Sequence, residues 1–231
     1  MHLVIFDVDG TLTRTTAVDA VCYERAVSDH LGVRIDTDWS TYRHATDAGI
    51  LSELLERHEL PESPSRLAAV RHRFLELLSA AVTADPDCCR EVPGARAVIE
   101  YLSELPHMQL AIATGAWADS ARLKLRHAKI PAEQLPFASS DDSPSRERLL
   151  QITFDRAAAR TRMKMDAVTC VGDALWDLSA ARSLGFRFVG IARNGDASRL
   201  RSAGAEVVFP DFTDRDAFVR ELLAGSLEGH R

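Results

Sequence analysis

The sequence predicts an α/β fold in which a largely parallel β-sheet is covered by helices on both faces and interrupted by an all-helical insertion. Short apolar runs of strand length recur along the chain, and segments with helical spacing separate the later runs. Between residues 15 and 90 only helical patterns occur. A chain of 231 residues can form one large core, or a core and a smaller domain.

The elements follow from these patterns in chain order. The predicted strands are Leu3–Phe6, Leu110–Ala113, a weaker Phe137–Ser140, Val168–Val171, Phe186–Ile191 and Val207–Phe209. The predicted helices of the α/β part are Ala95–Leu105, Ala116–His127, Arg146–Thr161 and Leu175–Leu184. Those of the insertion are Thr16–His30, Asp47–His58 and Ser65–Val82. We therefore expect a discontinuous α/β core of residues 1–15 and 90–231, and a helical domain of residues 16–89.

Composition narrows the class of protein. With 46% hydrophobic residues, 27% charged residues and a net charge of -6, the chain is typical of a soluble globular protein. It has no basic patch for nucleic acid and no apolar run of about 18 residues for a membrane, so we expect a cytoplasmic protein. The four cysteines lack CxxC spacing, and we interpret them as reduced thiols.

Two aspartates follow the first predicted strand. Asp7 comes at the carboxyl end of that strand, where open α/β sheets place ligand groups, and Asp9 follows two residues later. Two carboxylates held together favour a divalent cation, and oxygen ligands favour Mg²⁺. Gly10 lets the backbone turn closely around a bound group. The alternative is a strand that ends in a simple Asx turn.

Two further predicted strands also end in polar residues. Thr114 and Gly115 place a hydroxyl and a backbone amide just before a helix, which suits either a bound anion or a helix cap. Asp173 and Asp177 are four residues apart, so on a helix their carboxylates share a face and repel each other unless a cation lies between them. The alternative role for Asp173 is that of an N-cap.

A basic residue begins the next helix. Ser143 as N-cap and Pro144 at the first helical position would place Arg146 in the first turn. A cation there opposes the helix dipole, which is justified if an anion binds at the same place. The alternative is a solvated surface arginine.

Taken together, these motifs resemble those of the haloacid dehalogenase superfamily. "DVDGT" resembles the first motif, Thr114 the second, Arg146 the basic third and "GDALWD" the fourth, in the same order over residues 1–15 and 90–212. The helical insertion after the first motif resembles the mobile cap of the phosphoglycolate phosphatase and β-phosphoglucomutase branch. The resemblance implies a Rossmann-like core, with the first strand between those that end in Thr114 and Asp173.

The resemblance also implies roles for these residues. Asp7 would be the nucleophile that forms an aspartyl-phosphate, and Asp9 would be the general acid and base. The Mg²⁺ ligands would be Asp7, the main-chain carbonyl of Asp9, and Asp173, with Asp177 or a water completing or steering the shell. Thr114, the Gly115 amide and Arg146 would hold the phosphoryl oxygens.

The basic residue departs from the family pattern, which usually has lysine where Arg146 stands. Neither Lys164, at the wrong end of a strand, nor Lys124, well into a helix, is a convincing replacement. Arginine can bind phosphate in a bidentate manner. Asp141 or Asp142 is expected to brace Arg146, and the sequence does not choose between them.

Substrate specificity is expected in the insertion. Arg43 and His44 precede a helix capped by Thr46 or Asp47, and these residues could contact an anionic or hydroxylated substrate tail. The alternative is a plain capped helix with solvated neighbours. Hinges are expected near 13–16 and 91–94.

The sequence thus predicts a magnesium-dependent phosphatase that hydrolyses a small phosphorylated metabolite, such as a phosphoglycolate-like or sugar phosphate monoester. An acid at position 9 favours an oxygen leaving group, because expelling a halide needs no proton. A phosphomutase of the β-phosphoglucomutase type is the first alternative, and a non-catalytic module that binds phosphate or metal is the second. We expect a monomer or a homodimer.

Overall fold

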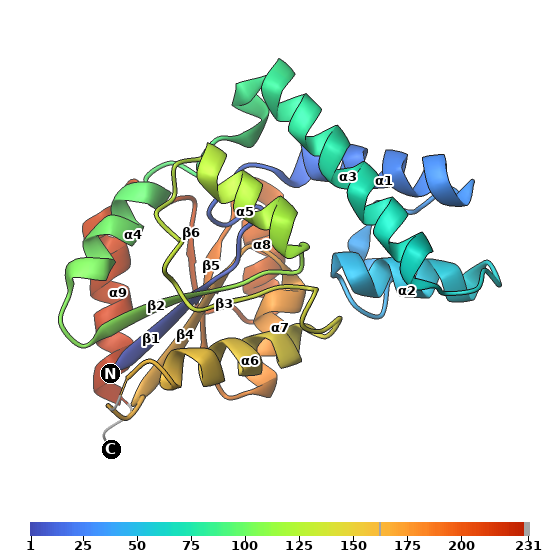
Figure 1. Ribbon diagram of the computed structural model, residues 1–231. Helices are drawn as coiled ribbons and strands as arrows, with labels where there is room; N and C mark the ends of the chain where they lie inside the picture. The colour runs from blue at the N-terminus through green and yellow to red at the C-terminus, as the bar shows by residue number, and fades with distance from the viewer. Residues whose placement is uncertain (162, 229–231) are drawn as a thin grey trace.

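A six-stranded parallel sheet forms the centre of the computed structural model, which describes residues 1–161 and 163–228 (Figure 1). The strand order is β3-β2-β1-β4-β5-β6, so β1 lies between β2 and β4 as the family resemblance implies. The strands are β1 (His2–Phe6), β2 (Met108–Ala113), β3 (Phe137–Ala138), β4 (Ala167–Gly172), β5 (Arg187–Ile191) and β6 (Val207–Phe209). The predicted α/β fold is confirmed.

Both faces of β1 are buried, which explains why its sequence is a continuous apolar run. Successive side chains of a strand point to opposite faces. Val4 and Phe6 pack in one apolar cluster with α4 (Ala95–Glu104) and α9 (Arg215–Glu228). Leu3 and Ile5 pack in the other with α6 (Arg146–Ala158), α7 (Leu175–Ser183) and α8 (Asn194–Ser202). The sheet is therefore a rigid platform whose carboxyl edge carries the polar residues.

Two core helices, α8 and α9, are not among the helices predicted from the sequence. Helix α8 has a mostly polar sequence and buries only Ala197 and Leu200 among its described side chains, which leaves little helical periodicity. Helix α9 does bury Phe218, Val219 and Leu222 at helical spacing, a signal that was present in the sequence.

The insertion is helical, as predicted. It contains α1 (Thr16–Leu31), α2 (Asp47–Arg57) and α3 (Pro64–Ala84), together with short 3₁₀ turns at Trp39–Thr41 and Pro86–Cys89. These helices pack around their own apolar cluster, which includes Tyr23, Leu54 and Phe74 and is extended by Trp117 from the core. Figure 1 shows them beyond the end of the sheet to which β1 points.

Two connections between insertion and core run side by side. The Arg14 amide donates to the Arg90 carbonyl at 2.8 Å, and the Val92 amide donates to the Leu12 carbonyl at 2.9 Å. These hydrogen bonds lie next to the expected boundaries and hinges. Within the described residues, no helix combines the length and apolar character needed to cross a membrane.

Candidate active site

Asp7 lies at the end of β1, where three strands bring polar residues together. Its side chain is buried, with the residue only 5% exposed, and its amide donates to the Val171 carbonyl of β4 at 3.0 Å. The Oδ1 atom accepts a hydrogen bond from Arg146 at 2.9 Å, and Oδ2 accepts a longer one from the Thr11 hydroxyl at 3.4 Å. One carboxylate oxygen is thus held by a cation and the other is only weakly engaged.

Asp173 and Asp177 approach Asp7 from the neighbouring strand β4. One carboxylate oxygen from each of the three residues lies within 4.8 Å of the others. The approach of the Asp173 carboxylate to the loop after β1 requires glycine at position 10. A Cβ on Gly10, whose φ is +81°, would lie 2.0 Å from an Asp173 carboxylate oxygen. Helix α7 begins at Leu175 with Ala174 as N-cap, so Asp173 precedes the helix and is not its cap.

The pKa shifts of these carboxylates indicate that too little positive charge lies beside them. Burial raises the pKa of Asp7 to about 7, with Arg146 opposing the shift and Asp177 and Asp9 adding to it. Burial and the charge of Asp7 raise the pKa of Asp173 well above its usual range. A divalent cation with oxygen ligands would relieve this repulsion, so the residues present fit Mg²⁺.

Arg146 is the first residue of α6 and reaches between the carboxylates. One of its guanidinium nitrogens lies 2.9 Å from Asp7 and 3.0 Å from Asp177. Its Nε is buried and has no hydrogen-bond partner among the described residues. The prediction that Ser143 caps this helix is wrong. Ser145 accepts the hydrogen bond from the Arg148 amide and is therefore the N-cap.

The expected brace for Arg146 is also different. Asp142 forms a two-pronged pair with Arg156, and Asp141 pairs with Arg71 and accepts from the Ala118 amide. Arg146 is held by the site carboxylates themselves, which could not be inferred from its neighbours in the sequence.

Thr114 and Gly115 follow β2 beside the same point. The Thr114 hydroxyl accepts from the Ala116 amide at 3.1 Å. Gly115 lies where any Cβ would meet Arg146 at 2.7 Å and the Ala45 carbonyl at 2.9 Å. Helix α5 (Ala118–His127) begins two residues later than predicted. The turn therefore brings main chain, guanidinium and insertion into one place.

Lys124 contacts Asp9, a relationship that the sequence reasoning missed. The lysine is fully buried, and its Nζ lies 2.7 Å from Asp9 Oδ1 and also pairs with Asp19 of α1. The same Asp9 oxygen accepts from the Thr15 hydroxyl at 2.5 Å. Burial opposes the charge of Lys124, but Asp19, Asp9 and Asp47 together raise its pKa above the usual range.

The insertion residues expected to bind substrate have different surroundings. Thr46 caps α2 by accepting from the Gly49 amide at 3.1 Å, and its hydroxyl donates to the Pro144 carbonyl of the core. Arg43 pairs with Glu53 and Glu56 on the surface. Among these candidates Thr46 lines the cavity described below, whereas Arg43 and His44 are not among its lining residues.

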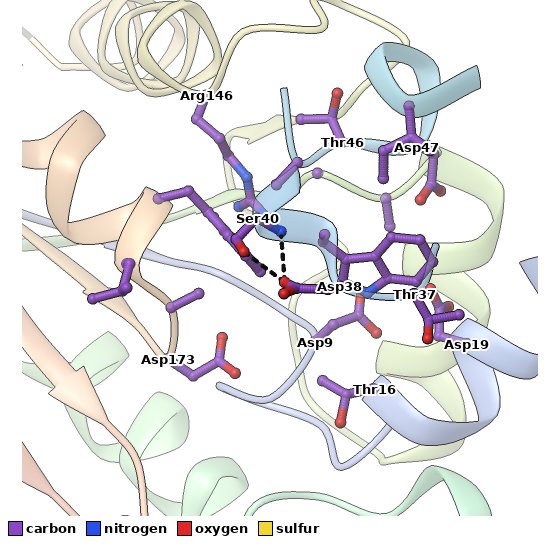
Figure 2. Close-up of a pocket in the computed structure, with 18 of the residues that line it drawn as sticks. Asp9, Thr16, Asp19, Thr37, Asp38, Ser40, Thr46, Asp47, Arg146 and Asp173 are labelled. Atoms are coloured by element: carbon purple, nitrogen blue, oxygen red, sulfur yellow. Dashed lines mark hydrogen bonds between the residues drawn. The ribbon is translucent and has the colours of Figure 1, made fainter. Parts of the chain in front are cut away.

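A cavity of about 370 Å³ lies between the core and the insertion (Figure 2). Asp9, Asp173 and Arg146 line it from the core, and Asp19 and Asp47 line it from the insertion. The cavity therefore connects Asp9 and Asp173 at the sheet edge with a second polar region that the sequence did not reveal, whereas Asp7 and Asp177 are not among its lining residues.

Comparison with known proteins identifies the family. The model of haloacid dehalogenase-like hydrolases matches residues 1–185. The chain belongs to the haloacid dehalogenase-like hydrolases. It is therefore a hydrolase of this family, and the resemblance predicted from the four motifs is confirmed. No curated protein matches the sequence.

Several solved structures share the fold over nearly the whole chain. A hydrolase from Pseudomonas syringae is 21% identical, with a TM-score of 0.72, over 96% of this chain and 99% of that one. CbbY from Rhodobacter sphaeroides, solved with phosphate, is 18% identical, with a TM-score of 0.67, over 92% and 95%. A family hydrolase from Deinococcus radiodurans R1, with bound phosphate and sodium, is 19% identical, with a TM-score of 0.57, over 95% of each chain.

Proposed function

We propose that this hydrolase is a magnesium-dependent phosphatase that cleaves a small phosphate monoester through an aspartyl-phosphate. The observation that carries the proposal is the placement of Asp7 beside Arg146 and two further carboxylates at the carboxyl edge of the sheet. A nucleophile, a cation for phosphoryl oxygens and a metal-binding set thus share one point. Phosphate bound to the CbbY and Deinococcus proteins is consistent with the same chemistry.

In the proposed first step, Asp7 attacks phosphorus. Oδ2 is the weakly engaged oxygen, so it is free to form the bond to phosphorus while the ester bond to the leaving oxygen breaks. Asp9 gives a proton to that oxygen. Asp9 then accepts a proton from water, which attacks phosphorus, releases phosphate and restores the Asp7 carboxylate. The Lys124 ammonium and the Thr15 hydroxyl both donate to Asp9 Oδ1, so Oδ2 is the oxygen that would carry the proton.

The remaining site residues position charge. Arg146 would hold the phosphoryl oxygens with Thr114 and the Gly115 amide, and its unpartnered Nε supplies a further donor. Mg²⁺, held by Asp7, the Asp9 carbonyl and Asp173 with support from Asp177, would neutralise the charge that builds up on the phosphoryl group. Residues 16–89 would act as the cap that excludes water.

Hydrolysis is favoured over a phosphomutase reaction by the charges in the cavity. A bisphosphorylated intermediate needs a second cationic site for its other phosphate. Of the described lining residues, only Arg146 and Arg199 are basic, and Arg146 belongs to the first phosphate. Arg199 also lines the cavity, and its guanidinium lies 3.7 Å from the Asp196 carboxylate. The cavity thus has one well-formed anion site.

The test is phosphate release from a panel of phosphate monoesters, with Mg²⁺ and with a chelator, by the wild type and Asp7→Asn. Release that requires Mg²⁺ and disappears in Asp7→Asn would support the proposal. Interconversion of sugar phosphate isomers without phosphate release would identify the mutase instead. Release that persists in Asp7→Asn would contradict the assigned nucleophile.

A further inference from the structure

The insertion's side of the cavity is acidic. It contributes the carboxylates of Asp19, Asp38 and Asp47, whereas none of its described lining residues is lysine, arginine or histidine. In Figure 2 Asp19 and Asp47 lie on the side away from Asp173, and Asp38 lies between them and Asp173. A substrate whose leaving group occupies this side therefore meets negative charge.

Asp47 is the most informative of these acids. It is only 8% exposed, and its Oδ2 accepts from the Trp117 amide at 2.8 Å. Its Oδ1 accepts no hydrogen bond from the part of the chain that the structure describes. Burial, followed by the charge of Asp19, raises the pKa of Asp47 well above its usual range. Asp47 thus lines the cavity with a buried carboxylate, one oxygen of which accepts no hydrogen bond from the described residues.

The basic residues nearby are already engaged. Lys124 binds Asp9 and Asp19 at once, so a single ammonium faces three carboxylates when Asp47 is counted. Arg199 has Asp196 beside it. A further positive charge is what this part of the cavity lacks.

Aromatic rings lie beside the acids. Tyr23 and Trp39 both line the cavity and meet edge to face, with ring centroids 6.0 Å apart, and Trp176 lines the facing wall. Aromatic faces attract alkylammonium groups, and carboxylates beside them add to the attraction. Acid and ring together select a cation over a neutral group of the same size.

We propose that the substrate is the phosphate ester of an amino alcohol, whose ammonium group binds between Asp47, Asp19 and the rings of Tyr23 and Trp39. The proposal rests on the phosphatase function proposed above and specifies its substrate class. It also accounts for Arg43, which is engaged by Glu53 and Glu56 and lies outside the lining that an anionic tail would reach.

The test compares three phosphate esters of nearly equal size that differ in the charge of the leaving group. O-phosphoethanolamine carries an ammonium, 2-hydroxyethyl phosphate a hydroxyl, and 2-phosphoglycolate a carboxylate. With wild-type protein and Mg²⁺, we expect kcat/KM for the ammonium ester to exceed that for the hydroxyl ester by about tenfold and that for the carboxylate by about 100-fold. p-Nitrophenyl phosphate serves as a general phosphatase substrate.

Two variants locate the preference. Asp47→Asn keeps an acceptor for the Trp117 amide and removes the charge, so the ratio of ammonium to hydroxyl ester should fall about tenfold. Glu53→Gln removes a carboxylate from the same helix, on the side that pairs with Arg43 and Arg57, and should leave the ratio unchanged.

The outcomes separate the two proposals. Mg²⁺-dependent turnover of p-nitrophenyl phosphate with no preference for the ammonium ester, or with a preference for the carboxylate, would overturn the substrate class and leave the phosphatase standing. An ammonium preference that survives in Asp47→Asn would overturn the assigned binding site. Absence of turnover for all four compounds would overturn the phosphatase proposal, and the substrate class with it.

Discussion

Two groups of buried or partly buried carboxylates, each arranged around one basic side chain, lie where the core meets the insertion. The core cluster is formed by Asp7, Asp173, Asp177 and Arg146. The hinge cluster is formed by Asp9, Asp19, Asp47 and Lys124. Each has three acids and one base, so each is short of positive charge. The core cluster fits a metal ion, and the hinge cluster fits a cationic leaving group.

The two clusters differ in the elements that hold them. Every member of the core cluster comes from the α/β part, at the ends of β1 and β4 or in the first turns of α6 and α7. The hinge cluster joins the loop after β1 to α1 and α2 of the insertion and α5 of the core. Movement of the insertion would change the hinge cluster and leave the core cluster intact. The core cluster thus holds the proposed nucleophile and metal site, and the hinge cluster links the proposed acid and base, Asp9, to the insertion.

The largest expected effect comes from removing a metal ligand of the core cluster. Asp173→Asn should lower kcat/KM by about 10³-fold, because the phosphoryl charge would no longer be neutralised by a firmly held Mg²⁺. Thermal unfolding measured at increasing Mg²⁺ concentrations would show weaker Mg²⁺ binding in the same variant. Asp196→Asn, on the cavity wall beside Arg199, is the matched control and should retain both properties.

Removing the base of the hinge cluster should act on stability first. Lys124→Met leaves Asp9 and Asp19 close together without their shared ammonium, which should lower the free energy of unfolding by about 3–5 kcal/mol. Urea unfolding measures the loss. Adding Asp19→Asn should recover part of it, because one of the stranded charges is removed. A double variant no more stable than Lys124→Met would contradict the shared ion pair.

Substitution of Arg146 tests whether arginine serves where the family usually has lysine. Arg146→Met should lower kcat/KM about 100-fold, because a cation for the phosphoryl oxygens is lost. Arg146→Lys keeps the positive charge but offers one ammonium nitrogen in place of the two terminal nitrogens of the guanidinium, so we expect activity within about tenfold of the wild type. Steady-state kinetics with p-nitrophenyl phosphate compare them. Equal losses in both variants would show that the guanidinium geometry is essential.

The smallest effect is a pH dependence of stability. The pKa of Asp7 rises from 3.8 to about 7 on folding, so its contribution to stability is present below about pH 4 and is lost as the pH rises through about 7. Bound Mg²⁺ favours the ionised carboxylate. The increase in Tm caused by Mg²⁺ should therefore be larger near pH 8 than near pH 5. In Asp7→Asn the difference between the two pH values should be smaller. An Mg²⁺-induced increase in Tm of the wild type that is equal at both pH values would contradict the raised pKa of Asp7.

The clusters also differ in how far the sequence reveals them. Asp7 and Asp173 each follow an apolar strand, and parallel strands bring their carboxyl ends to one edge, so their convergence could be predicted. The cap of α6 was displaced by two residues, because Ser143 and Ser145 are both competent N-caps. Local sequence does not decide between them.

Lys124 shows why the hinge cluster was missed. Its partners Asp9 and Asp19 come from segments more than 100 residues away in the sequence, on elements whose packing no local pattern specifies. A weak signal did exist. Lys124 falls on the helix face that contains Ala121, Leu125 and Ala128, where a lysine must be buried and therefore paired.

Identifying the phosphorylated residue tests the aspartyl-phosphate mechanism directly. Asp9→Asn lacks the base that activates water, so with p-nitrophenyl phosphate, whose leaving group needs little protonation, the covalent intermediate should accumulate. Rapid acid quenching and mass spectrometry of peptides would locate the phosphoryl group. We expect the phosphoryl group on Asp7 in Asp9→Asn, and no phosphoryl group in the Asp7→Asn/Asp9→Asn double variant. A phosphoryl group on another residue, or turnover by the double variant equal to that of Asp9→Asn, would contradict that mechanism.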